Sequence, residues 1–129
     1  MKSWKQNAVL FAVGGAGYTA LELLWRGTSH WTMTVTGGCV FVGLTDLAEK
    51  LKGESVPVRA AAGGLCITTA EFLVGMTVNR RFGRDVWDYS MFRGNVLGQI
   101  CPQFAALWSG LSVPAMALGK SMKTAMKKT

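Results

Sequence analysis

Charged residues are scarce in this 129-residue sequence, and they are nearly absent from four long stretches. The chain has 14 Lys or Arg and 7 Asp or Glu residues, while half of its residues are apolar. Residues 6–25 and 60–79 hold one Glu each, and residues 27–45 and 94–119 hold no charge. A soluble helical bundle would carry charged residues every three or four positions along each helix. The lack of such faces excludes a soluble bundle.

The four charge-poor stretches have the length of membrane-spanning helices. A helix rises about 1.5 Å per residue, so roughly 20 residues cross a hydrocarbon core of about 30 Å. We therefore predict an all-α fold, a four-helix transmembrane bundle that forms a single integral membrane domain. The predicted spans are residues 6–25, 29–46, 60–79 and 94–118, followed by a basic tail at 119–129.

Cysteine and histidine are too few and too dispersed for a disulfide framework or a metal site. Cys39, Cys66 and Cys101 fall in three different predicted spans, and His30 is the only histidine. We interpret the cysteines as small apolar residues buried between helices. No Ser or Cys stands beside an evident catalytic base, so we expect no metal and no cofactor, and we favour a non-enzymatic function over a membrane-embedded enzyme.

The first span has some features of a secretory leader, because Lys2 and Lys5 precede an apolar run that starts at Ala8. A leader would end in small residues at a cleavage site. Glu22 stands in that region instead, and three more predicted spans follow. We therefore expect this stretch to remain in the protein as its first span.

Lysine is confined to three segments that four spans would place on one side of the membrane. These segments are the N-terminus, the loop around Lys50 and Lys52, and the tail. With Arg59, that side holds nine basic residues and the other side five, so we predict a multi-pass protein of the cell (inner) membrane with both termini cytoplasmic. The tail would attract anionic lipids. It lacks the interleaved aromatic residues that would favour nucleic acid.

Part of the first span resembles part of the third when the sequence is shifted by 49 residues. Five of eleven aligned positions are identical: Gly14-Gly15 with Gly63-Gly64, Thr19 with Thr68, Glu22 with Glu71, and Leu24 with Leu73. This suggests two tandem helical hairpins related by a pseudo-twofold axis along the membrane normal. Chance similarity between glycine-rich helices is the alternative. Small residues also allow close helix packing, and Gly94 with Gly98 fits the small-xxx-small dimer pattern.

Two acidic residues lie inside predicted spans, where an ionisable side chain is costly unless it is paired or functional. Glu22 has Arg26 four residues later on the same helix face, which offers a structural ion pair. Glu71 has no basic residue one turn away, so it needs a partner from another helix, a proton or a bound cation. A third acid, Asp46, lies at the inner end of the second span, where an interfacial ion pair is expected.

The predicted outer loops, which join the first two and the last two spans, are rich in aromatic and polar residues. The density exceeds the aromatic belt expected at a bilayer surface. Asn95 and Gln99 would share one face in the first turns of the fourth helix, where free N–H groups could receive an anion, and Pro102 could kink that helix. For Asp88, an ion-pair network with loop arginines and a polar cavity shared with Glu71 both stay open.

Several short motifs resemble a known family. They are Trp87-Asp88-Tyr89-Ser90, Asn95-Val-Leu-Gly98-Gln99-Ile100-Cys101, Glu71-Phe72 and Gly17-Tyr18 with Glu22. In these residues the chain resembles the ABC-transporter type IV family of small membrane proteins, which is itself similar to transmembrane protein 229. The resemblance covers most of the spans and implies a multi-helix membrane protein of bacterial type. It carries over, without individual roles, Glu22, Glu71, Trp87, Asp88, Tyr89, Asn95, Gly98 and Gln99. The chain contains no nucleotide-binding P-loop.

We expect a transporter or channel for a small solute or ion, with a polar site near the outer ends of the first, third and fourth spans. The candidate ligand-binding residues are Glu22, Glu71, Asn79, Trp87, Asp88, Tyr89, Asn95 and Gln99. Four helices seldom enclose a path alone, so we expect a homo-oligomer. The alternative is an accessory or interaction subunit of a larger membrane complex that uses the outer loops as its contact surface.

Overall fold

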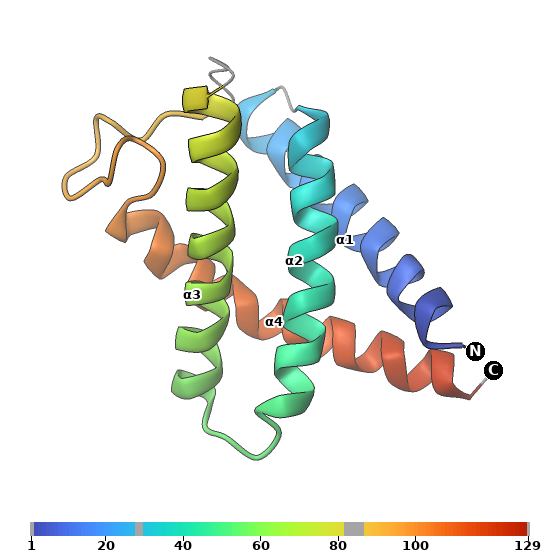
Figure 1. Ribbon diagram of the computed structural model, residues 1–129. Helices are drawn as coiled ribbons and strands as arrows, with labels where there is room; N and C mark the ends of the chain where they lie inside the picture. Colours follow the sequence, from blue (N-terminus) through green and yellow to red (C-terminus); the bar gives the residue numbers. More distant parts are fainter. Residues whose placement is uncertain (1, 28–29, 82–86, 129) are drawn as a thin grey trace. The chain divides into compact units, whose positions relative to one another are not determined.

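The computed structural model describes residues 2–27, 30–81 and 87–128, without the side chains of Arg26, Arg80 and Arg81. It contains four α-helices, labelled in Figure 1: α1 (Ser3–Arg26), α2 (Trp31–Lys50), α3 (Val56–Gly75) and α4 (Pro102–Lys127). A π-helical segment, η1 (Met76–Arg81), continues α3. Within these residues there is no strand, only an isolated bridge between Val96 and Ile100. The predicted all-α class is confirmed.

Two of the four helices are long and apolar enough to cross a membrane. They are α1, over Ser3–Trp25, and α3 together with most of η1, over Val56–Asn79. The four membrane crossings themselves stay predictions. In α2 the last turns carry Asp46, Glu49 and Lys50, and the end of α4 carries several lysines, so both helices combine apolar and charged segments.

The predicted start of the fourth span is wrong by two helical turns. Residues 94–101 form turns rather than helix, and α4 begins at Pro102. Gly94, Leu97 and Gly98 have positive φ angles of 75°, 53° and 73°, which end any helical path. Pro102 therefore does not kink the helix from inside. It is the first helical residue, where its missing N–H would have had no partner in any case.

The segment predicted as a basic tail is helical, because α4 continues through it to Lys127. Pro114 is the proline inside this helix. It marks the boundary between two compact units, one formed by Met1–Glu54 with Pro114–Thr129 and the other by Ser55–Val113. The two units are described separately below.

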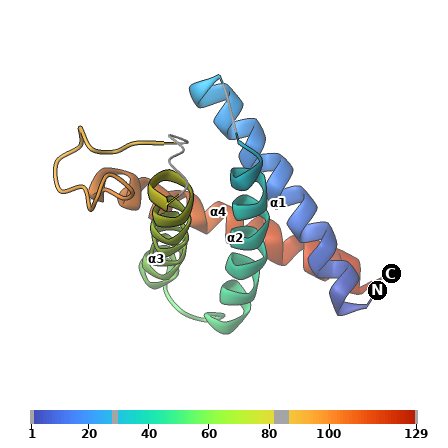
Figure 2. The same ribbon diagram turned by 45° about the horizontal axis from the view of Figure 1, so that its top comes forward.

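The first unit contains a hairpin of α1 and α2 that lie side by side in Figures 1 and 2. Glycines allow this close contact, since a Cβ at Gly15 would overlap Thr34 and one at Gly37 would overlap Tyr18. Thr19 and Thr34 share a hydrogen bond of 2.6 Å across the pair. The predicted packing through small residues is thus present in this hairpin.

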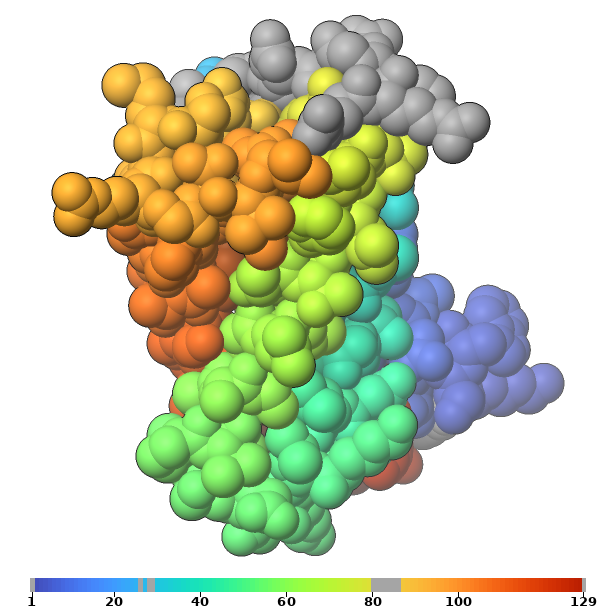
Figure 3. Space-filling model, turned by 60° about the vertical axis from the view of Figure 1, so that its left-hand side comes forward, coloured from blue at the N-terminus to red at the C-terminus, as the bar shows by residue number. Residues whose placement is uncertain are grey.

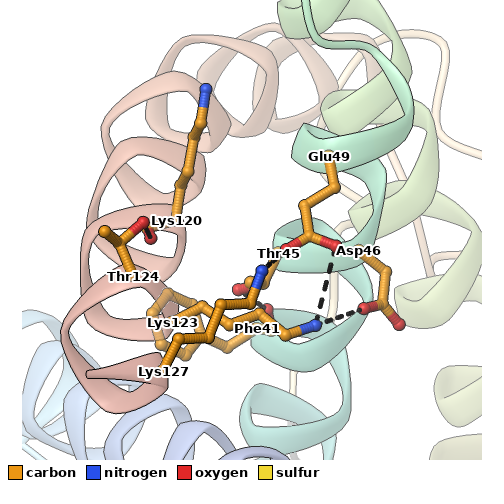
Figure 4. A network of polar contacts seen from close by, with 8 residues as sticks. All are labelled: Phe41, Thr45, Asp46, Glu49, Lys120, Lys123, Thr124 and Lys127. Atoms are coloured by element: carbon orange, nitrogen blue, oxygen red, sulfur yellow. Dashed lines mark hydrogen bonds and ion pairs between the residues drawn. The ribbon is translucent and has the colours of Figure 1, made fainter.

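The end of α4 packs on the end of α2 in the same unit. Leu10, Phe41 and Met126 form a buried apolar cluster there. Beside it, Lys123 lies 3.4 Å from Asp46 and 3.7 Å from Glu49, and Lys127 lies 3.8 Å from Glu49 (Figure 4). Asp46 therefore has the expected ion pair.

The second unit contains α3, η1, the loop at 87–101 and the first half of α4. At Gly64 a Cβ would overlap the side chain of Ser109, so these helices touch closely. Ser112 donates to the backbone oxygen of Ser109 at 2.8 Å and to that of Ala60 at 3.4 Å. A close helix contact with small residues on both sides thus joins α3 to α4.

Replacing Gly64 with Ala should destabilise the protein by about 1–3 kcal/mol, because the added methyl group has no space beside Ser109. Gly17→Ala is the matched control. Nothing lies within 4 Å of a Cβ at Gly17, so Ala there should be neutral or stabilising. Thermal unfolding in detergent measures both variants. Equal melting temperatures for the two would contradict the close contact between α3 and α4.

Replacing Lys123 with Met should lower the free energy of unfolding by about 0.5–1 kcal/mol at low salt, because the pair with Asp46 and Glu49 is partly exposed. The difference from wild type should shrink in roughly 1 M salt, which screens such pairs. Lys120→Met is the control, since Lys120 points away from the acidic residues in Figure 4. A salt-independent loss would indicate that Lys123 acts through packing instead.

Candidate functional site: a buried carboxylate under a hydrogen-bonded loop

The centre of the site is Glu71, on the buried face of α3. Its side chain is only 4% exposed. The oxygen Oε2 accepts a hydrogen bond from the Tyr89 hydroxyl at 2.8 Å, and Oε1 accepts one from the Trp108 indole N–H at 2.9 Å. Burying a carboxylate without partners costs several kcal/mol, so these donors are required for the fold as well as for any function. Of the three options left open for Glu71, a partner from another helix is present, since Trp108 belongs to α4.

Aromatic rings surround the two donors. Tyr89 stacks on Phe104 with ring centroids 4.7 Å apart and an interplanar angle of 13°. Phe92 meets both rings edge-on, and Phe104 lies 6.2 Å from Trp108. Stacked and edge-on rings of this kind fix one another's orientation. The cluster therefore holds the Tyr89 hydroxyl and the Trp108 N–H at the carboxylate.

A second hydrogen-bonded group lies one turn farther along α3, centred on Gln99. Its oxygen Oε1 accepts from the Asn79 amide at 2.9 Å, and its amide donates to the backbone oxygen of Leu97 at 2.8 Å. Asn79 also donates to the backbone oxygen of Trp87 at 3.0 Å, while the Trp87 indole N–H donates to that of Gln99 at 2.9 Å. Gly75 leaves room for this group, because a Cβ there would overlap Gln99.

Asn95 and Asp88 organise the loop itself. The Asn95 amide donates to the backbone oxygens of Ser90 and Phe92, and its oxygen accepts from the Gly98 N–H at 3.0 Å. Asp88 is exposed and accepts from the Ser90 N–H at 2.9 Å. The bond from the Ser90 N–H lowers the pKa of Asp88 below its ordinary value, and a bond from the Ser90 side chain adds a smaller effect in the same direction.

The structure places five of the eight candidate residues in two hydrogen-bonded groups. One group contains Glu71 and Tyr89, and the other contains Asn79, Trp87 and Gln99. The prediction that Asn95 and Gln99 occupy a helix N-terminus is wrong, since both belong to the turns before α4. Asp88 and Asn95 both bond to the loop backbone, and their place in a polar cavity shared with Glu71 and Gln99 stays a prediction. The arginines proposed to pair with Asp88 lie outside the described residues or side chains, except Arg93.

Glu22 belongs to the first unit, where it is likewise buried, with 6% exposure. Its predicted partner Arg26 has a side chain outside the described part of the structure. Two repeat positions nevertheless have matching surroundings within their own units. Gly15 and Gly64 both pack against the next helix, and Glu22 and Glu71 are both buried.

Sequence reasoning missed Trp108 and Phe104, which complete the site from α4. Both lie within the predicted fourth span, and neither was among the candidate residues. One signal was present in Trp108, a tryptophan far from either end of a charge-free stretch. An indole N–H needs a hydrogen-bond acceptor when it is buried, and Glu71 is one of the two carboxylates in the charge-poor stretches.

The described residues contain no group of three or more His, Cys, Asp or Glu side chains that could hold a metal ion. Within that same part of the chain, all three cysteines are free. The site is therefore made of one carboxylate, two amides and aromatic donors. Such groups can bind and orient a small polar or cationic ligand.

An all-α chain with two apolar helices of membrane-spanning length, one of which buries a hydrogen-bonded carboxylate, has the features of an integral membrane protein. The chain belongs to the family described as "Putative ABC-transporter type IV", whose model matches residues 4–128. The family resemblance inferred from the motifs is confirmed. No curated protein and no solved structure is similar enough to the chain to match it.

Removing the Tyr89 hydroxyl with Tyr89→Phe should destabilise the protein by about 1–2 kcal/mol, because Glu71 loses a donor while the stack on Phe104 remains. A double-mutant cycle with Glu71→Gln, followed by thermal unfolding in detergent, isolates the interaction. A coupling of at least about 0.5 kcal/mol is expected. Strictly additive effects would show that the hydrogen bond contributes nothing to stability.

Proposed function

We propose that this chain is a transport protein, a transporter or channel for a small solute or ion, and that Glu71 is the ligand-binding carboxylate. The family is transporter-related by its description. The observation that carries the proposal is the position of Glu71 on an apolar helix, buried and hydrogen-bonded from two other segments. Acidic residues inside membrane helices are rare and most often mark the path of an ion or substrate.

The neighbours of Glu71 suit a cationic or hydrogen-bonding ligand. The carboxylate supplies negative charge, while the amides of Gln99 and Asn79 supply donors and acceptors about one and two turns away along the helix. The faces of Tyr89 and Trp108 can attract a cation. The Trp87 indole N–H orients Gln99 by donating to the backbone oxygen of Gln99. Glu22 is a second candidate carboxylate in the other unit.

The proposed transporter crosses the inner cell membrane four times, with both termini in the cytoplasm, and works as a homo-oligomer. The bias of basic residues and the small-residue helix faces support this arrangement. At the cytoplasmic surface, Lys120 and Lys128 make no ion pair within the described residues, unlike Lys123 and Lys127, and are the candidates for binding anionic lipids.

A second candidate function is that of an accessory subunit in a larger membrane complex. It is favoured by the family description taken together with the sequence, which contains no P-loop. ATP-driven transport needs a nucleotide-binding subunit, so in that role the chain would work beside a separate ATPase. Gentle extraction followed by identification of co-purified proteins tests this function.

Purified protein in proteoliposomes should conduct at least one of Na⁺, K⁺ or H⁺ above the rate of protein-free vesicles, measured with ion-sensitive dyes. Glu71→Gln should lower that flux about tenfold, equivalent to roughly 1.4 kcal/mol of lost stabilisation along the path. Glu54→Gln, which alters an exposed acid in the turn before α3, should leave it within about twofold.

Equal flux in wild type and Glu71→Gln would remove Glu71 from the path. No flux above background for any of the three ions would count against cation transport and favour the accessory function. Circular dichroism and size-exclusion profiles that match wild type establish that each variant is folded.

A further inference from the structure

Within the second unit, α4 is much shorter than the helix it covers. The stretch Val56–Asn79 has 24 residues and a length of about 36 Å. The part of α4 in this unit, Pro102–Val113, is only about 18 Å long at 1.5 Å per residue. This first part of α4 can therefore cover about half of the stretch Val56–Asn79.

The contacts show which half is covered by helix. Ser112 bonds to Ala60 near the N-terminal end of α3, Ser109 meets Gly64, and Trp108 bonds to Glu71. From Glu71 onward, α3 and η1 are covered by the loop at 87–101, through Tyr89, Trp87 and Gln99 (Figure 1). In Figure 3 the amber and orange atoms of this loop lie against the yellow-green end of α3.

These contacts place the loop at a defined depth beside α3. A hydrocarbon core of about 30 Å centred on a helix of about 36 Å leaves roughly 3 Å at each end. Gly75, which touches Trp87 and Gln99, is then about 3 Å inside the hydrocarbon boundary, and Glu71 is about 9 Å inside it. Asn79, which bonds to the Trp87 backbone oxygen, is the last residue of the stretch and lies about 3 Å outside the boundary.

We propose that residues 87–101 form a re-entrant segment that enters the bilayer beside α3, with Met91, Val96 and Leu97 facing lipid acyl chains. The proposal rests on the membrane crossing of α3 and not on the transported ligand. Together, the re-entrant segment and the first half of α4 cover the length of Val56–Asn79, which neither of them covers alone.

Non-helical backbone is tolerated at this depth only where its polar groups are bonded within the protein. Several backbone groups of the segment meet that condition through its own side chains and turns. The Val96 N–H donates to the backbone oxygen of Ile100 at 2.9 Å, and the Gln99 N–H donates to that of Val96 at 3.0 Å. The Tyr89 N–H donates to the backbone oxygen of Gly98 at 2.8 Å. The Asn95 side chain makes three further bonds to the backbone of the segment.

Several apolar side chains of the segment are exposed, beside the polar Asp88, Ser90 and Arg93. Met91 is 97% exposed, Leu97 54% and Val96 46%. Leu97 is held in the left-handed region, which costs a branched residue about 1–2 kcal/mol and directs an apolar group outward. In lipid this exposure is favourable. The two charges fit as well, because Asp88 lies beside Trp87 near the boundary, and the long side chain of Arg93 can reach the headgroups.

Photocrosslinking from the segment tests the proposal. The variant Met91→p-benzoylphenylalanine is reconstituted in phosphatidylcholine vesicles, illuminated, and analysed by intact-protein mass spectrometry before and after alkaline hydrolysis of the lipid esters. An acyl-chain adduct keeps a fatty acid after hydrolysis, whereas a headgroup adduct does not. Glu54→p-benzoylphenylalanine is the matched control, at an exposed position before the start of α3.

Met91 should give an acyl-chain adduct with a yield at least about fivefold above that of Glu54, since only the former lies at acyl-chain depth. Val96→p-benzoylphenylalanine should behave as Met91 does and replaces it if the Met91 variant does not fold. A yield equal to that of Glu54, headgroup adducts alone, or crosslinks to a second copy or another protein would overturn the proposal. Failure of the protein to float with the vesicles would overturn the membrane crossing of α3 itself, independently of any flux measurement.

Discussion

Glu71 accepts hydrogen bonds from Tyr89 and Trp108, and both donors come from outside α3. A carboxylate on an apolar helix has no partner of its own, so the chain must bring partners to it. Tyr89 brings the loop at 87–101, and Trp108 brings the first half of α4. Most of the second unit is thus arranged around the requirement to satisfy one acidic side chain, and the aromatic stack on Phe104 keeps both donors in place.

The two units use similar solutions for joining helices. In each one, glycine on the first helix allows contact with the next, and a glutamate seven residues after it is buried. The glycine at position 15 faces Thr34, and the one at 64 faces Ser109. This agreement goes beyond residue identity, because the aligned glycines both contact the next helix and the aligned glutamates are both buried. It gives the internal repeat a physical basis in helix packing.

The sequence was informative where a signal is local and not where partners are distant in the chain. The charge-poor stretches predicted the all-α class, and Glu71 stood out as one of the two acidic residues inside them. The ion pair of Asp46 was expected, but its partner Lys123 lies 77 residues away, which no local pattern indicates. Residues 94–101 were mistaken for helix because they carry no charge. Gly94 and Gly98, which fit a helix-dimer motif, are instead left-handed turn residues.

The distances along the chain between Glu71 and its donors bear on how the protein is made. Tyr89 follows Glu71 by 18 residues and Trp108 follows it by 37. During synthesis, α3 is therefore complete before either donor has been added to the chain. Until then its carboxylate must remain in contact with water, take up a proton, or be held by the insertion machinery. In the proposed membrane topology, stable integration of α3 would then be coupled to synthesis of the first turns of α4.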